Sequence, residues 1–129
     1  MIRFLGFYKR KPGLTHEQFN DHWLNIHGPC VRNVPGGDQY LKKYIQHRLT
    51  IDPLSQEQDF VYDGFSEGWF ESLEARDAFI TLPGLKEVIE DEERFLDLTA
   101  TRWMVMDEHA LQIDRVSEFP HPPLRGPGL

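Results

Sequence analysis

The order in which strand-like and helical segments follow one another constrains this fold more than any other feature of the sequence. Residues 2–9 are mostly apolar and lead into a Lys-Pro-Gly turn, which predicts a buried strand. Helical patterns occupy residues 15–30 and 72–96. Three further strand-like segments lie at residues 40–51, 60–70 and 99–106. The sequence therefore predicts the order β-α-β-β-α-β.

The two helical segments carry clear start and stop signals. Thr15 is an N-cap residue, and Gln18 occupies the capping-box position. An apolar stripe follows at intervals of four, three and four residues, and it consists of Phe19, Trp23, Ile26 and Cys30. Gly28-Pro29 predicts that the first helix ends or bends sharply there, and Pro83-Gly84 divides the second helical segment into two.

A β-α-β-β-α-β chain forms an α+β fold of the ferredoxin-like type, a four-stranded antiparallel sheet with both helices on one face. The other face of this sheet has no cover within one chain. Because the burial of apolar surface is worth about 25 cal/mol per Å², we expect a second copy to close over that face. The predicted state is a homodimer.

Composition and charge limit the kind of protein this is. A length of 129 residues with 40% hydrophobic residues suits one domain with a real core. The formal charge of −7 argues against binding to nucleic acids or acidic membrane surfaces. One cysteine, and an N-terminal apolar stretch too short for a signal peptide or membrane span, predict a cytoplasmic protein. We assign residues 1–107 to the folded domain and the Pro/Gly-rich residues 108–129 to a C-terminal arm.

Two histidines near the end of the first helix are candidates for chemistry. His22 and His27 are five residues apart, so on an α-helix they diverge by roughly 140°, which argues against a shared metal site. Trp23 and His27 share a face, and the helix end supplies carbonyl groups that can hold an imidazole N–H. We expect His27 at the mouth of a cavity, although a simple capping role is an equal alternative. For His22 we expect a solvent-facing position or a partner in Asp21 or Asp38.

A third histidine lies in the segment predicted to be the second strand. Alternation places His47 on the same face as Ile45 and Leu49, and Tyr44 on the opposite face. A histidine among apolar neighbours is a candidate base near neutral pH. A core histidine with satisfied hydrogen bonds is the alternative.

Asp63 begins an acidic and aromatic face on the third predicted strand, which it shares with Phe65, Glu67 and Trp69. If this face meets that of His47, the carboxylate of Asp63 would fix the tautomer of the imidazole. A cross-strand ion pair with Lys43 or Arg102 is the alternative.

Motifs for cofactors are missing from the sequence. It contains no G-x-G-x-x-G, P-loop, G-x-S-x-G or H-E-x-x-H pattern. We therefore expect neither a cofactor nor a metal ion.

Two stretches of the sequence resemble a known family. The segments KRKPGLTHEQFNDHWLNIHGP and YDGFSEGWFESLEA are similar to the EthD family of dimeric α/β-barrel proteins, and the resemblance spans about residues 1–107. It implies a ferredoxin-like fold that dimerises through its sheets. It also implies a small cofactor-free enzyme of aromatic polyketide or lactone metabolism, although family members from ether-degradation clusters have no clear activity. The resemblance points to His27 and Asp63 as functional positions.

The resemblance and the residues together suggest a mechanism. We expect a lyase that dehydrates or decarboxylates an aromatic polyketide-type intermediate, with His27 and His47 as base and acid and Asp63 orienting one of them. The expected walls of the substrate pocket are Trp23, Tyr44, Phe65 and Trp69. The alternatives are an isomerase or cyclase, a cofactor-free oxygenase, or a non-catalytic dimer that binds a small molecule.

Overall fold

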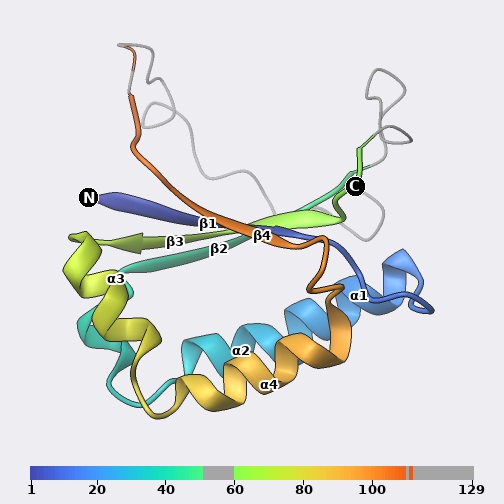
Figure 1. Ribbon diagram of the computed structural model, residues 1–129, viewed down its shortest axis with the longest axis horizontal. Helices are drawn as coiled ribbons and strands as arrows, with labels where there is room; N and C mark the ends of the chain where they lie inside the picture. The colour runs from blue at the N-terminus through green and yellow to red at the C-terminus, as the bar shows by residue number, and fades with distance from the viewer. Residues whose placement is uncertain (51–59, 110, 112–129) are drawn as a thin grey trace, which may run out of the picture.

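The computed structural model of the protein describes residues 1–50, 60–109 and 111. Its core is an antiparallel sheet of four strands in the order β2-β3-β1-β4. The strands are β1 (Ile2–Tyr8), β2 (Lys43–Arg48), β3 (Gly64–Phe70) and β4 (Arg102–Met106). All helices lie against one face of this sheet (Figure 1). The predicted α+β ferredoxin-like fold is confirmed. The expected turn at 52–59 and most of the expected arm lie outside the described residues.

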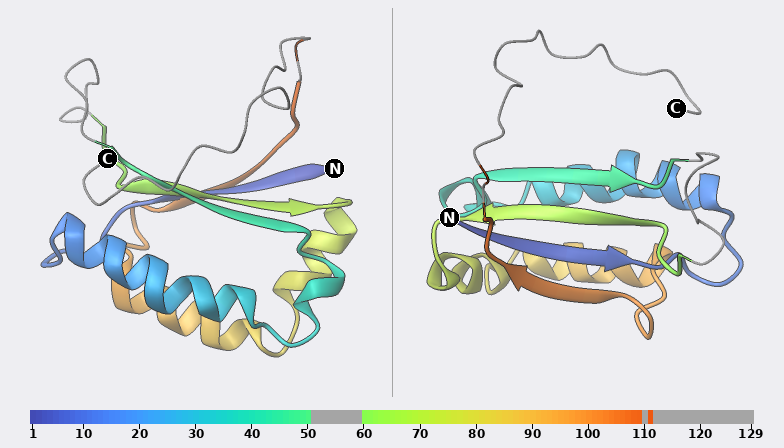
Figure 2. Two further views of the ribbon diagram at one scale, coloured as in Figure 1. Left: turned by 180° about the vertical axis from the view of Figure 1, so that it is seen from behind. Right: turned by 90° about the horizontal axis from the view of Figure 1, so that it is seen from above.

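The helix layer consists of two long rods that run side by side beneath the sheet (Figure 2). The first rod contains α1 (His16–His22), the π-helical turn η1 (Trp23–His27) and α2 (Gly28–Arg32). A short 3-10 helix, η2 (Gly37–Gln39), follows it. The second half of the layer contains α3 (Leu73–Ile80) and α4 (Leu85–Phe95). No helix in the described part of the chain is long and apolar enough to cross a membrane.

The first rod does not end at Gly28-Pro29, and in this respect the expectation is wrong. In an α-helix the ring of Pro29 would clash with the carbonyl of Asn25, four residues earlier. The rod instead widens into a π-helical turn, in which the Gly28 N–H bonds to the carbonyl of Trp23. Gln46 Nε2 donates to the same carbonyl at 2.8 Å. A Cβ at Gly28 would come within 3.2 Å of that Gln46 nitrogen, so glycine leaves room for this bond.

Side-chain caps fix where the helices begin. The capping box predicted at Thr15 is present: its hydroxyl accepts from the Gln18 N–H at 3.1 Å, and the Gln18 side chain accepts from the Thr15 N–H at 2.9 Å. Ser72 caps α3 by accepting from the Ala75 N–H at 3.1 Å. These local signals set the register of both helical segments.

Small residues on the helix side of the sheet make room for the structures beneath it. In β3 the residues that face the helices include Gly64, Ser66 and Gly68. A Cβ at Gly64 would lie 2.7 Å from the ring of Trp23, so this indole packs directly on the β3 backbone. Farther along β3, Gly68 leaves space that the helices do not fill, and the cavity described below lies there.

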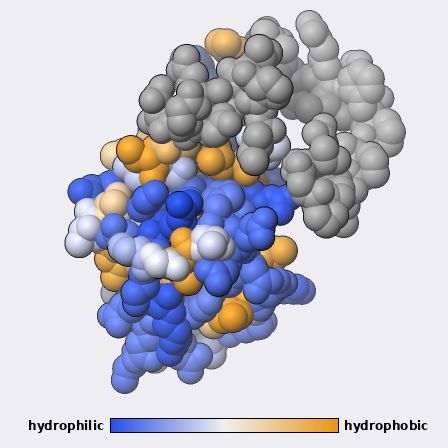
Figure 3. Space-filling view, turned by 90° about the vertical axis from the view of Figure 1, so that its right-hand side faces the viewer, coloured by the Kyte–Doolittle hydropathy of each residue, from blue (hydrophilic) through white to orange (hydrophobic). Residues whose placement is uncertain are grey.

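The opposite face of the sheet is open in a single chain. Its side chains form cross-strand rows, which the register places as Lys43–Trp69–Arg3–Met106, Ile45–Glu67–Leu5–Met104 and His47–Phe65–Phe7–Arg102. Figure 3 shows hydrophobic residues gathered toward the sheet, with a mostly hydrophilic surface over the helix layer below. The open face is therefore a mixture of apolar side chains and paired charges.

Candidate active site

A cavity of about 160 Å³ lies between the helix side of the sheet and the helices. Most of its wall is apolar. Strands and helices both contribute aromatic and aliphatic side chains to it, among them Phe4 of β1, Phe70 of β3, Phe79 of α3 and Val88 of α4. The polar members of the wall are His27, Tyr8, Tyr44, Ser66, Glu92 and Trp103. The arrangement is that of a small-molecule site, apolar with a few convergent polar groups.

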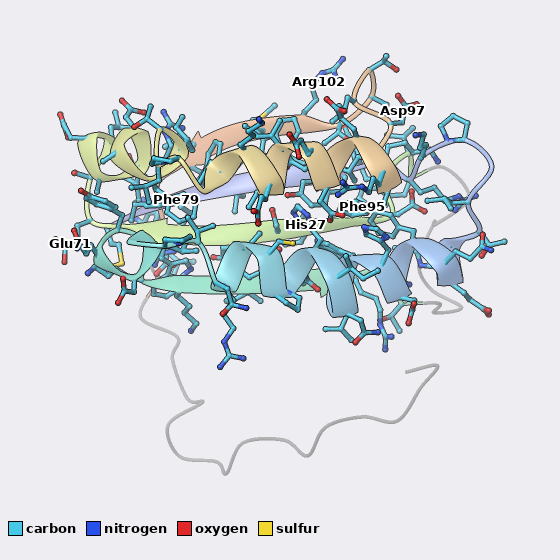
Figure 4. All side chains as sticks on the ribbon, turned by 90° about the horizontal axis from the view of Figure 1, so that it is seen from below. His27, Glu71, Phe79, Phe95, Asp97 and Arg102 are labelled. Atoms are coloured by element: carbon cyan, nitrogen blue, oxygen red, sulfur yellow. The ribbon has the colours of Figure 1, made fainter. Side chains whose placement is uncertain are left out.

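His27 is the strongest candidate for chemistry in this cavity. It lies in the middle of the helix layer, between the two rods (Figure 4), and its side chain is 1% exposed. Nδ1 lies 2.9 Å from Oδ2 of Asp91, a residue of α4 that is equally buried. An ionised carboxylate only accepts hydrogen bonds, so the proton of a neutral His27 is on Nδ1. Nε2 is then the nitrogen that remains for the cavity, and it carries a lone pair.

The protonation states of this pair suit a base. Burial lowers the pKa of His27 below its ordinary value, although the hydrogen bond and the charge of Asp91 oppose this effect. For Asp91, burial alone would raise the pKa, but hydrogen bonds from His22 and His27 outweigh burial and lower it. Near neutral pH the site therefore holds a neutral imidazole beside a carboxylate.

His22 also reaches Asp91, and the expectation that the two histidines diverge is wrong. Nε2 of His22 lies 2.8 Å from Oδ1 of Asp91, while His27 occupies the other oxygen. The π-helical turn is the cause, because it brings residues five apart onto one face. His22 therefore pairs with neither Asp21 nor Asp38. Among the residues that the structure describes, no group of three or more His, Cys, Asp or Glu side chains is arranged to hold a metal ion.

Glu92 is a second titratable group in the cavity wall. Burial, with the nearby charge of Asp91, raises the pKa of Glu92 to about 7. Burial also raises the pKa of Tyr44 to about 12 and that of Tyr8 well above its ordinary value, so both phenols stay protonated. The polar part of the cavity wall thus contains one candidate base, one acid that is close to half protonated at neutral pH, and two hydroxyl donors.

His47 does not reach this cavity. It lies on the open face of the sheet, where its Nε2 is 3.1 Å from Oε2 of Glu67 and its ring stacks on Phe65 at 4.2 Å. The sheet therefore separates His47 from His27, and the structure does not support the pairing of these two as acid and base in one site. The predicted alternation within each strand is correct. His47 faces the open side of the sheet together with Glu67, and Glu67 is the carboxylate that it contacts.

Asp63 orients neither His27 nor His47. β3 begins at Gly64, so Asp63 lies just before the first residue of the strand. It is 3% exposed. Its carboxylate accepts from the Arg10 backbone N–H and from Arg10 Nη1, both at 2.8 Å, and it lies 2.9 Å from Nδ1 of His16. Burial would raise the pKa of Asp63, yet these contacts lower it. The visible role of Asp63 is to tie the end of β1 to the start of α1.

The match to a known domain decides the family. The EthD domain matches residues 11–99 of this chain. The protein belongs to the EthD family.

Solved structures of other proteins share the fold of this EthD protein. An EthD family protein from Bacillus halodurans C-125 superposes with a TM-score of 0.66 at 19% identity, covering 84% of this chain and 99% of that one. A dimeric protein of unknown function from Bacteroides fragilis has a TM-score of 0.61 at 9% identity, with 83% and 95% covered. A hydroxynitrile lyase from Passiflora edulis has a TM-score of 0.61 at 13% identity, with 85% and 96% covered. No curated protein sequence matches the chain. These likenesses show the fold, and some proteins of this fold are enzymes.

The predicted pocket walls of the EthD domain divide between the two sides of the sheet. Tyr44 lines the cavity. It faces away from His47, as the alternation along the strand predicts, and the cavity lies on the Tyr44 side of the sheet. Trp23 is 1% exposed and packs on Tyr8 and under Gly64, beside the cavity rather than in its wall. Phe65 and Trp69 face the open side, because alternation puts them opposite the small residues of β3. The guanidinium carbon of Arg3 lies there over the Trp69 ring, 3.5 Å from the ring centre.

Sequence reasoning missed the two acidic residues of the site. Asp91 and Glu92 belong to the run EDEER, whose charges predict a solvated helix face. One signal was present: Asp91 lies three residues after Val88 and four before Phe95, at a position where the apolar stripe of α4 calls for a hydrophobic residue. A carboxylate on an apolar stripe predicts a buried partner, and here the partners are histidines.

Proposed function

We propose that this EthD protein is a cofactor-independent acid–base lyase. Its substrate is an uncharged ring compound of the aromatic polyketide type, which carries a carbonyl group and a hydroxyl that leaves as water. The observation that supports this proposal best is the His27–Asp91 pair, buried between the helices with Nε2 left for an apolar cavity. No other pair of titratable groups in the described residues combines such burial with a cavity.

The reaction needs one base and one acid. His27 Nε2 removes a proton from a carbon next to the carbonyl, and Asp91 stabilises the imidazolium that forms. Glu92, whose pKa is raised to about 7, gives its proton to the departing hydroxyl, which leaves as water. A carbon–carbon double bond forms, and transfer of the proton from His27 to Glu92 restores the starting state. The hydroxyl groups of Tyr8 and Tyr44 are placed to hold the carbonyl oxygen.

The charge of the wall favours dehydration over decarboxylation. The described residues that line the cavity include no lysine or arginine, while they include Glu92. A substrate carboxylate would lose its hydration there and gain no cation in return. The loss of a neutral hydroxyl meets no such cost.

The size of the cavity suits one ring. A cavity of about 150 Å³ in another protein holds benzene, and the volume here is about 160 Å³. We propose that the reacting ring of the substrate enters the cavity and that any further rings remain at its mouth.

We also propose that the protein is a homodimer that forms through the open face of its sheet. Leu5, Phe7, Phe65 and Met104 would gain cover there. Two relatives of the same fold, from Bacteroides fragilis and Thermobifida fusca, are described as dimeric.

A dimer that only binds an apolar ligand is the second candidate, because most of the cavity wall is apolar. Turnover separates the two functions. The purified protein is incubated with a panel of monocyclic β-hydroxy ketones, and product formation is followed by the ultraviolet absorbance of the new conjugated system. We expect His27→Ala to reduce turnover by about 10²–10⁴-fold while ligand binding, measured by calorimetry, persists.

The matched control is His47→Ala, which removes an imidazole from the opposite face of the same sheet. It should leave turnover within about twofold of the wild type, since His47 does not reach the cavity. Binding without turnover by the wild type would favour the binding protein, and equal loss in both variants would remove His27 from its special role.

A further inference from the structure

One carboxylate in the helix layer accepts hydrogen bonds from two imidazoles in different surroundings. Oδ2 of Asp91 accepts a hydrogen bond from His27, whose side chain is 1% exposed. Oδ1 accepts one from His22, whose side chain is 21% exposed. The distances are 2.9 Å and 2.8 Å. Asp91 thus connects an imidazole in the cavity wall to one that solvent reaches.

The backbone is built to make this connection. On a regular α-helix the two histidines would point roughly 140° apart. The π-helical turn Trp23–His27 lies between them and aligns them. The His22 ring also stacks on Phe95 at 4.8 Å, nearly parallel, which fixes the direction of its Nε2. Phe95 contacts His27 at 4.8 Å as well, so one phenyl ring supports both imidazoles.

We propose that His22 is a positioning residue, which acts on His27 through Asp91. The inference rests on the role of His27 as the base of the proposed function. By holding Oδ1, His22 keeps the carboxylate turned so that Oδ2 meets Nδ1 of His27. That contact keeps the proton on Nδ1 and leaves Nε2 bare toward the cavity. Without His22, the next donor to Oδ1 is Arg94, whose Nη1 is 3.3 Å away and which is 62% exposed.

The charge of His22 gives a second effect, on the protonation of His27. A proton on His22 draws on the same carboxylate that stabilises an imidazolium at His27, and it lowers the pKa of His27. Other titratable and charged groups also face these two histidines. His22 is faced from α4 by Asp91 and Arg94, and His27 is faced by Asp91, Glu92, Tyr8 and Tyr44.

The test needs no substrate. Long-range proton–nitrogen spectra of ¹⁵N-labelled protein distinguish Nδ1–H from Nε2–H in each histidine. In the wild type we expect His27 in the Nδ1–H form. In His22→Phe, which keeps the stacking on Phe95 but has no donor, the ratio of Nδ1–H to Nε2–H should fall about three- to tenfold, as loss of one hydrogen bond implies. His22→Gln, which offers an uncharged N–H at the place of Nε2, should restore the ratio.

His16→Phe is the matched control. His16 belongs to the same helix, pairs with a buried carboxylate and stacks on a phenylalanine, but its carboxylate is Asp63. This variant should leave the His27 ratio unchanged. An unchanged ratio in folded His22→Phe, or an equal fall in His16→Phe, overturns the proposal.

The wild type provides a measurement that does not depend on any variant folding. A change in the charge of His22 should appear as an inflection in the pH dependence of the His27 nitrogen signals. If they show none, the coupling is refuted. A protein that turns over no compound of the panel but passes these tests would refute the proposed function and leave the role of His22 intact.

Discussion

The two faces of the sheet each carry a histidine beside a carboxylate, and the two pairs differ in nearly everything else. On the helix side, His27 and Asp91 are both 1% exposed. On the open side, the side chains of His47 and Glu67 are 40% and 19% exposed. The distances are almost the same, 2.9 Å and 3.1 Å. The difference between the pairs is therefore their exposure to water: an exposed pair contributes little to stability, whereas a buried carboxylate that loses its partner is strongly destabilising.

Neutralising each carboxylate in turn is the most direct test of the difference between the two pairs. We expect Asp91→Asn to lower the free energy of unfolding by about 3 kcal/mol, because one buried and one partly buried hydrogen bond lose their charged acceptor. Glu67→Gln should cost less than about 1 kcal/mol. Urea unfolding of both variants at pH 7 measures the difference. Equal losses would show that the two faces are electrostatically alike in the folded protein.

A second test uses the acid of the cavity. The pKa of folded Glu92 is raised to about 7 from 4.5. The folded state therefore binds this proton more tightly, and the stability it contributes is complete below about pH 4.5 and is lost as the pH rises through 7. Glu92→Gln should remove this loss, a difference of about 3 kcal/mol between pH 4.5 and 8, since one pKa unit corresponds to about 1.4 kcal/mol.

The measurement for Glu92 is the free energy of unfolding as a function of pH, in the wild type and in the variant. Glu93→Gln is the control, because Glu93 is the next residue of α4 and is exposed. Parallel pH profiles for wild type and Glu92→Gln would mean that Glu92 is ionised in water rather than held in the wall.

The smallest effect on folding, within about 1 kcal/mol, is expected on the open face. Leu5→Glu places a charge in the middle row of this face, beside Glu67 and Met104. We expect it to turn the proposed dimer into monomers, as measured by analytical ultracentrifugation. Leu24→Glu, at a leucine of the helix layer that is 63% exposed, should leave the assembly unchanged. A Leu5→Glu protein of wild-type mass would place any dimer contact elsewhere.

The sequence predicts the fold well because the fold depends on local patterns. Periodicity, the capping box at Thr15 and the turn residues each specify one element, and the order β-α-β-β-α-β of these elements is that of the ferredoxin-like arrangement. The alternation on the second strand also separates Tyr44 from His47 correctly. The sequence of that strand does not indicate which of its faces the helices cover. The cavity was therefore expected on the His47 face, whereas it lies on the Tyr44 face.

The site depends on features that local patterns reveal only in part. The contact between His27 and Asp91 joins residues 64 positions apart. The alignment of His22 with His27 depends on a π-helical turn, whereas the α-helical period of 100° per residue predicts divergence. Pro29 was the available signal, since a proline inside a helix requires either a break or a wider turn. The sequence predicts an end or a sharp bend at this point, and a wider turn is what forms.

The run of small residues on β3 has a consequence for how such a protein changes over time. Gly68 lines the cavity from the sheet, while the proposed base and acid, His27 and Glu92, come from the helix layer. Replacing Gly68 by a larger residue would change the volume of the cavity while the proposed base and acid stay in place. Under the proposed function, one scaffold could accept new substrates while its base and acid stay the same.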